Sequence, residues 1–103
     1  MRIASKLKLL IGFEDVYKKR HDEIWPELKV LLKETGITDY SIFLDEQTND
    51  LFAYFAIEDE EKLNELPVKE VMKKWWDYMK DIMETNEDNS PVSIPLKEVF
   101  FLP

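Results

Sequence analysis

Apolar and polar residues alternate over the first eleven positions of the chain. Ile3, Leu7, Leu9 and Ile11 fall on one face of an extended segment, and lysines at positions 6 and 8 fall on the other. A period of two is typical of a strand with one buried face, so the pattern predicts a strand over residues 3–11. Gly12 ends this strand.

The next segment, residues 13–35, has the 3.6-residue period of a helix. Its apolar stripe consists of Phe13, Tyr17, His21, Ile24, Leu28 and Leu31. Pro26 interrupts this helix because proline has no N–H to donate to the carbonyl of Asp22, four residues back. We therefore expect a kink, or a break with Pro26 at the first position of a second helical segment. Gly36 is suited to a left-handed cap.

The rest of the chain carries the patterns of three further strands and a second helix. We expect a strand over residues 40–44, a polar turn over 46–50 and a strand over 51–57 that is apolar on both faces. A short helical turn over 58–61, capped by Asp59, should follow, and then a helix over 68–83 opened by Pro67. A loop over 85–91 and a last strand over 96–102 complete the chain. The buried face of the second helix is predicted to carry Val68, Met72, Trp75, Met79 and Met83, with Trp76 at its margin.

The order β-α-β-β-α-β is that of a ferredoxin-like α+β sandwich, here a single domain over residues 1–103. In this fold both helices cover the same face of the sheet. The strand over 51–57 is apolar on both faces, so the second face also needs a cover. A second copy of the chain would provide one, and we expect a homodimer packed through sheets or strand edges.

Composition narrows the class of partner. The chain of 103 residues is 45% hydrophobic and has no cysteine, which indicates a folded domain without disulfides or thiolate metal sites. No stretch has the length and apolarity of a membrane span or of a signal-peptide core, so a cytoplasmic location is expected. The net charge of −8 disfavours nucleic acid and anionic membranes, and a neutral ligand is expected.

The only histidine, His21, lies in the apolar stripe, four residues after Tyr17 and four before Trp25. It is either a half-buried structural histidine bonded to a backbone carbonyl, or a general acid or base assisted by the Tyr17 hydroxyl. The carbonyl of Asp22, left free by Pro26, is a candidate partner for one ring nitrogen. A single histidine excludes a multi-histidine metal site, and no acidic cluster has the loop spacing of a magnesium or calcium site.

Trp75 and Trp76 are consecutive, so both cannot point squarely into the core of one helix. Either one indole is buried and the other lies at an interface, or the pair forms a platform for the C–H face of a sugar or another small ring. Tyr40, on a predicted strand, is either a core residue or a hydroxyl directed into a pocket.

Four segments of the chain closely resemble the L-rhamnose mutarotases: residues 21–28 (His-Asp-Glu-Ile-Trp-Pro-Glu-Leu), residues 75–83 (Trp-Trp-Asp-Tyr-Met-Lys-Asp-Ile-Met), residues 88–91 (Asp-Asn-Ser-Pro) and residues 99–103 (Val-Phe-Phe-Leu-Pro). The resemblance implies a dimeric α/β barrel of ferredoxin-like subunits. It implies interconversion of the α and β anomers of L-rhamnose, in rhamnose metabolism, with no cofactor and no metal. By position, His21 resembles the proton donor of the family, and the sugar contacts correspond to Tyr17, Tyr40, Trp75 and Trp76.

The chain departs from the family near its end, where Phe101 stands at a position that is tyrosine in some members. The missing hydroxyl is expected to affect pocket polarity or the dimer seam. Two other functions stay open at this point. One is a cofactor-free monooxygenase or a haem-degrading relative on the same barrel, with His21 binding haem or orienting the substrate. The other is a binding module without catalytic activity.

Overall fold

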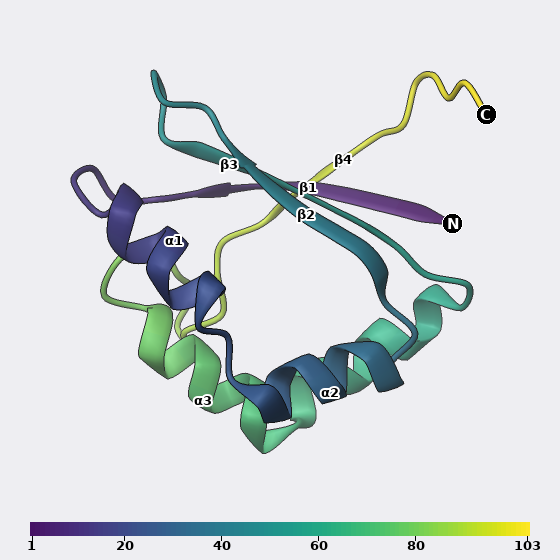
Figure 1. Ribbon diagram of the computed structural model, residues 1–103, viewed down its shortest axis with the longest axis horizontal. Helices are drawn as coiled ribbons and strands as arrows, with labels where there is room; N and C mark the ends of the chain where they lie inside the picture. Colours follow the sequence, from purple (N-terminus) through teal and green to yellow (C-terminus); the bar gives the residue numbers. More distant parts are fainter.

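The computed structural model covers residues 1–103 and contains one antiparallel four-stranded sheet with helices on one of its faces (Figure 1). The elements in chain order are β1 (Arg2–Lys8), α1 (Glu14–Asp22), α2 (Pro26–Glu34), β2 (Thr38–Leu44), β3 (Asp50–Ala56), η1 (Glu60–Val68, a 3₁₀ helix), α3 (Glu70–Met79) and β4 (Ile94–Leu96). The strands are ordered β2-β3-β1-β4 across the sheet. This topology confirms the predicted ferredoxin-like fold.

The helical segment after β1 is broken at Pro26, as predicted. Pro26 is the first residue of α2, and Trp25 before it has an extended backbone with ψ 132°. A residue that precedes proline avoids helical angles, so α1 ends at Asp22 and α2 starts in a new direction. Gly36 follows α2 with φ +100°. Its N–H donates to the carbonyl of Lys33, a bond that closes the end of the helix before β2 begins.

Strand β2 contains a bulge next to Tyr40. Thr38 pairs with Ala56, whereas Ser41 pairs with Tyr54, so β2 has one residue more than β3 over this stretch. Asp39 has φ +53°, an uncommon value for a residue other than glycine. A bulge bends the strand and re-aims the side chains beside it. It therefore helps to set the direction of Tyr40.

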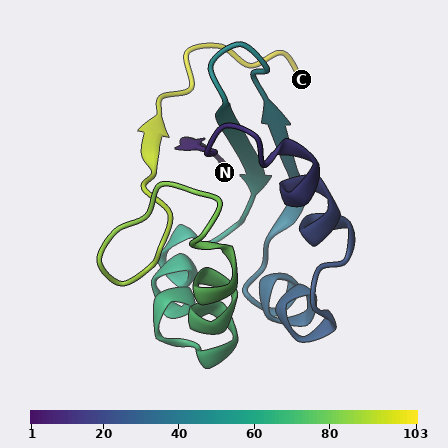
Figure 2. The same ribbon diagram turned by 90° about the vertical axis from the view of Figure 1, so that its left-hand side faces the viewer.

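The core lies between the helices and the inner face of the sheet (Figure 2). Its fully buried side chains come from β3, α2 and the segments that follow β1 and α3: Leu9, Leu28, Leu51 and Ile82. The outer face has no such cover within one chain. Phe43 is 66% exposed, and Ile94 and Leu96 are exposed as well. None of the helices is both long and apolar enough to cross a membrane.

The predicted first strand is too long at its C-terminal end. β1 ends at Lys8, which pairs with Asp50 at the first position of β3, so the ladder has no further partner there. Leu9 is buried and forms an isolated bridge with Met83, whereas Ile11 is 87% exposed beside Gly12. The prediction that Ile11 is buried is wrong because alternation alone does not indicate where a partner strand ends.

The predicted last strand is wrong in position. β4 covers Ile94–Leu96 and pairs with β1 in the register that places Leu96 opposite Ala4. Because the two strands are antiparallel, only two residues of β1, Arg2 and Ile3, lie beyond this pair. Residues 97–103 therefore leave the sheet (Figure 1). The side chain of Arg2 makes two contacts with this tail: it pairs with Glu98, and its guanidinium lies 3.4 Å from the centroid of the Phe101 ring.

The start of the second predicted helix also differs. Pro67 lies inside η1 and does not open the α-helix, and Lys69 has an extended backbone with ψ 134°, so α3 begins at Glu70. Val68 is consequently 69% exposed and is not part of the buried face. The expected cap at Asp59 is confirmed, since its carboxylate accepts a hydrogen bond from the N–H of Glu61 at 3.1 Å.

Candidate functional site

A cavity lies between the inner face of the sheet and the helices. Its empty volume, with the mouth that opens to solvent, is about 510 Å³. It is lined by Leu7 from β1, Tyr17 and His21 from α1, Tyr40 and Ile42 from β2, Met72, Trp75, Trp76 and Met79 from α3, and Met83, Thr85, Asn89 and Pro91 from the segment that follows. All five residues that the sequence marked as candidates therefore line one cavity.

His21 lies in the last turn of α1, one turn after Tyr17, and the two rings stack with their centroids 4.2 Å apart. Its Nδ1 is 3.1 Å from the backbone carbonyl of Tyr17. A carbonyl oxygen only accepts, so Nδ1 carries the hydrogen and donates it. The neutral ring then has an unprotonated Nε2 with no hydrogen-bond partner in the chain.

The expected bond between His21 and the carbonyl of Asp22 is wrong; the partner is the carbonyl of Tyr17. The reason is geometric, because helical side chains point back toward the N-terminus of their helix. His21 therefore reaches the carbonyl four residues before it and not the carbonyl that Pro26 leaves free.

Burial lowers the pKa of His21 from its ordinary value of 6.5. Two smaller effects act in the opposite direction, namely the hydrogen bond with the Tyr17 carbonyl and the charge of Asp22. Burial prevails because it disfavours the charged imidazolium. At neutral pH the ring is therefore uncharged and ready to accept a proton at Nε2.

Two phenol groups line the same cavity. Burial raises the pKa of Tyr17 far above its ordinary value, and a charge on Tyr40 would raise it further. Burial at the cavity also raises the pKa of Tyr40, while 45% of the whole residue is exposed to solvent. Both hydroxyls stay protonated at neutral pH and are free of hydrogen bonds within the chain, so both can donate to a ligand.

The two indoles differ in burial. Trp75 is 6% exposed and packs edge-to-face on His21, with ring centroids 5.5 Å apart, and on Trp25 at 5.1 Å. Trp76 is half-buried and packs against the core from the side of the cavity. Trp75 is thus the core indole of the pair and also a wall of the cavity.

The sequence analysis missed the wall formed by residues 83–91. Thr85, Asn89 and Pro91 line the cavity from this segment, which the sequence identified only as a loop. The signal was present in residues 88–91, one of the four segments that resemble the mutarotases. Nothing in their polar, turn-forming composition showed that they face the aromatic residues of α1 and α3.

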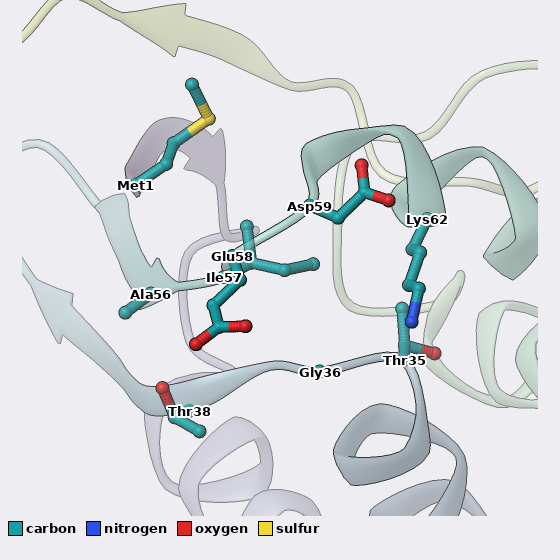
Figure 3. A pocket seen from close by; sticks show the side chains of 9 residues that line it. All are labelled: Met1, Thr35, Gly36, Thr38, Ala56, Ile57, Glu58, Asp59 and Lys62. Atoms are coloured by element: carbon teal, nitrogen blue, oxygen red, sulfur yellow. The ribbon is translucent and has the colours of Figure 1, made fainter.

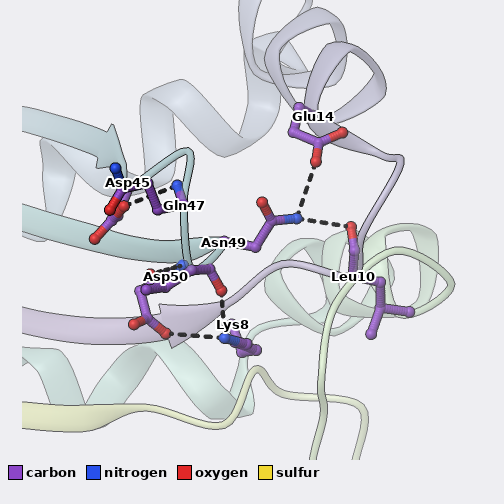
Figure 4. A network of polar contacts seen from close by, with 8 residues as sticks. Lys8, Leu10, Glu14, Asp45, Gln47, Asn49 and Asp50 are labelled. Atoms are coloured by element: carbon purple, nitrogen blue, oxygen red, sulfur yellow. Dashed lines mark hydrogen bonds and ion pairs between the residues drawn. The ribbon is translucent and has the colours of Figure 1, made fainter.

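A polar network fixes the start of α1 relative to the β2–β3 hairpin (Figure 4). The buried side chain of Asn49 donates to Glu14 Oε1 at 3.0 Å and to the carbonyl of Leu10 at 3.4 Å. A hydrogen bond from its own backbone N–H, one from the Asn49 amide and one from the N–H of Gly12 together hold the pKa of Glu14 below its ordinary value. Tyr17 and His21 follow within the same helix, so this network sets where both enter the cavity.

A second pocket lies at the opposite end of the sheet, where the Gly36 turn meets the start of η1 (Figure 3). Its empty volume, again with the part that opens to solvent, is about 680 Å³, which is larger than that of the first cavity. Its charged side chains, Glu58, Asp59 and Lys62, are exposed to solvent, and it contains neither histidine nor an aromatic ring. It lacks the convergent, partly buried polar groups of the first cavity. No group of three or more His, Asp or Glu side chains in the structure is arranged to hold a metal ion.

The sequence and the fold of the chain are similar to those of known proteins. A family model for L-rhamnose mutarotase matches residues 2–102. The L-rhamnose mutarotase of Formosa agariphila is 54% identical over 101 residues, which are 98% of this chain and 97% of that protein. The L-rhamnose mutarotase of Bacteroides thetaiotaomicron is 55% identical over the same length and the same shares. The crystal structure of the Formosa agariphila enzyme superposes with a TM-score of 0.93 and 53% identity, covering 100% of this chain and 99% of that one.

More distant structures share the fold alone. An antibiotic biosynthesis monooxygenase from Nitrosomonas europaea superposes with a TM-score of 0.64 over 96% of this chain and 89% of its own, at 10% identity. Such likeness places the chain among ferredoxin-like folds and carries no argument for monooxygenase chemistry. The similarity to the mutarotases is much stronger: the family model matches almost the full length of the chain, and the relatives are more than 50% identical along almost the whole sequence. The chain belongs to the L-rhamnose mutarotase family.

Proposed function

We propose that His21 performs the proton transfers of anomer exchange, and that Tyr17, Tyr40, Trp75 and Trp76 hold the sugar around it. Membership of the family makes the chain a mutarotase, an isomerase of rhamnose metabolism. The observation that carries the assignment of His21 is its free Nε2, in a cavity whose other polar groups are hydroxyls, indole N–H groups and an amide.

Exchange of anomers requires the hemiacetal to open. The hydroxyl on C1 loses its proton, the bond between C1 and the ring oxygen breaks, and the ring oxygen takes up a proton, which leaves an open-chain aldehyde. Both oxygens are attached to C1, so one imidazole nitrogen facing them is close to each in turn. Nε2 accepts the proton from the C1 hydroxyl and then delivers it to the ring oxygen.

Closure of the ring repeats these transfers in reverse. Rotation about the C1–C2 bond presents the other face of the aldehyde to the hydroxyl on C5, which attacks C1. Nε2 takes the proton from the attacking hydroxyl and returns it to the oxygen on C1. The imidazole of His21 returns to its initial neutral state, no hydride moves, and no carbon–carbon bond is formed or broken.

The protonation states of the cavity suit this sequence. The neutral His21 accepts the first proton because burial lowers its pKa, and the same burial favours release of that proton to the sugar. Tyr17 and Tyr40 stay protonated, so their hydroxyls donate hydrogen bonds to an oxygen that develops negative charge. The chain therefore supplies one group that exchanges protons near neutral pH and two that remain donors.

L-rhamnose, a neutral 6-deoxy sugar, suits the remaining walls. Its methyl group and C–H edges match a lining that includes Met72, Trp75, Trp76 and Met79 from α3. Indole rings pack well on such surfaces and offer one N–H donor each. An uncharged sugar is also indifferent to the net charge of −8.

The homodimer is part of the same proposal. The outer face of the sheet exposes Phe43, Ile94 and Leu96, and the tail exposes Val99 and Phe100. These apolar surfaces lie away from the helices and have no cover in one chain (Figure 1). A second copy packed on this face would bury them and leave the cavity on the opposite face accessible.

Anomer exchange measured by NMR tests the function. The two anomeric protons of L-rhamnose give separate signals, and selective inversion of one is transferred to the other at the exchange rate. The purified chain is expected to raise this rate above that of the buffer in proportion to its concentration. A rate that equals the buffer control at every protein concentration would refute the proposed activity.

A further inference from the structure

Asn89 lines the cavity and has so far been given no role. Its side-chain Nδ2 donates to Asp77 Oδ1 at 2.6 Å. Asp77 directly follows Trp76 in α3, so this bond ties the loop to the helix that carries both indoles. Its length is typical of a charge-assisted hydrogen bond, which is stronger than a bond between neutral groups.

The bond to Asp77 also fixes which way the amide faces. A carboxylate accepts hydrogen bonds and donates none, so the NH₂ group of Asn89 has to face Asp77. The amide oxygen Oδ1 is then on the other side, and no group of the chain donates to it. Asn89 thus presents a free acceptor beside the cavity, whereas Tyr17, Tyr40 and the indoles offer donors.

The loop that carries Asn89 is held by its own hydrogen bonds. The N–H of Asn86 donates to the carbonyl of Ser90 at 2.7 Å, and the N–H of Asn89 donates to the carbonyl of Asn86 at 3.0 Å. Thr85 and Pro91 form a bridge at the base of the loop. Asn89 has φ +70°, in the left-handed region that asparagine adopts more readily than most residues other than glycine. The acceptor is therefore positioned before a ligand arrives.

We infer that Asn89 determines sugar specificity by accepting a hydrogen bond from one ring hydroxyl of the substrate, and that Asp77 is the residue that positions its amide. This inference rests on the proposed function. An acceptor that pairs with the correct hydroxyl loses that hydrogen bond when the substrate is an epimer whose hydroxyl points elsewhere. The aromatic walls contact C–H surface and offer no acceptor for a ring hydroxyl.

The test compares three variants with the wild-type chain. Asn89→Gly removes the amide, and glycine adopts φ +70° without strain. Asp77→Asn removes the charge that orients the amide and leaves Asn89 in place. Glu87→Gly is the matched control, because Glu87 is an exposed loop residue outside the cavity lining and its replacement adds the same backbone freedom.

Anomer exchange is measured by NMR for L-rhamnose and for its 2-, 3- and 4-epimers. Asn89→Gly is expected to lower kcat/KM for L-rhamnose roughly 3- to 10-fold, the usual worth of one hydrogen bond. For the epimer at the contacted carbon, kcat/KM should change little, so discrimination falls at that one carbon only. Asp77→Asn should shift the same epimer ratio by a smaller factor. The double variant should be no worse than Asn89→Gly alone, and Glu87→Gly should match the wild type.

Wild-type activity on L-rhamnose tests the proposed function separately. If the wild type is active and Asn89→Gly keeps all epimer ratios, or loses activity equally on every sugar, Asn89 does not determine specificity and the inference is overturned. If Asn89→Gly does not fold by circular dichroism, the epimer ratios of Asp77→Asn decide. Ratios identical to those of the wild type would then overturn the inference.

Discussion

The two consecutive tryptophans offer a prediction that separates stability from binding. Trp75 is 6% exposed, contacts His21 and Trp25 edge-to-face, and belongs to the main core cluster. Trp76 is half-buried and packs on that cluster from the cavity. Trp75→Ala should therefore mainly lower the free energy of unfolding, and Trp76→Ala should mainly weaken sugar binding.

The magnitudes follow from burial. Truncation of a buried aromatic side chain to alanine lowers the free energy of unfolding by about 3–5 kcal/mol, which is the expectation for Trp75→Ala. The half-buried Trp76 removes less surface from water, so Trp76→Ala should lower it by about 1–2 kcal/mol. With a urea dependence of roughly 1.5 kcal/mol/M, the first change lowers the unfolding midpoint by roughly 2–3 M and the second by roughly 1 M.

Urea unfolding followed by circular dichroism measures the stability of each variant, and tryptophan fluorescence measures L-rhamnose binding. Trp25 lies outside the cavity lining, so Trp75 and Trp76 are the two indoles that a bound sugar can contact. The sugar-dependent change in fluorescence should be smaller in Trp76→Ala than in the wild type. Equal midpoint shifts for the two variants, or a sugar response unaffected by loss of Trp76, would refute this division of roles.

Four further predictions concern pH, metal and assembly. Because burial lowers the pKa of His21 below 6.5 and the neutral ring accepts the first proton, kcat/KM should rise with pH and have its midpoint below pH 6.5; a midpoint above pH 6.5, or a fall between pH 6.5 and 8, would contradict this. The unfolded chain binds the proton more readily than the folded one, so His21 should also make urea stability decrease as pH falls below 6.5. Exchange should persist after exhaustive treatment with EDTA, and a loss reversed by one divalent ion would contradict the proposed chemistry. Light scattering at micromolar concentration should give twice the 12.3 kDa of one chain, and a monomer mass would refute the dimer.

The order of helices and strands was predictable because each has a strong periodic pattern or a clear break. Pro26 ends one helix and begins the next, and Gly36 adopts the left-handed conformation expected of it. The ends of strands were not predictable, since they depend on partners. Ile11 and residues 97–103 continue an apolar pattern past the point where β3 and β1 can pair with them.

The residues of the cavity also fall into some that the sequence could predict and some that it could not. Tyr17 and His21 were accessible to sequence reasoning because one helix places residues four apart together. Asn89 was not, because its position depends on a loop that folds back onto α3 and on a bond to Asp77, twelve residues away. The partner of the His21 ring was assigned to the wrong carbonyl, since the choice depends on the direction of a side chain within its helix.

The most direct test of the proposed mechanism is the exchange rate of His21→Asn. Asparagine retains a group able to form hydrogen bonds but does not exchange protons near neutral pH. Spontaneous exchange sets a floor, so an enzyme-free control in weakly catalysing buffer is subtracted from each NMR rate. Loss of a positioned general acid or base lowers a rate roughly 10²–10⁴-fold, and His21→Asn should fall by that factor while its circular dichroism stays native. Exchange close to the wild-type rate in a natively folded His21→Asn variant would show that His21 is a structural residue and would contradict the mechanism.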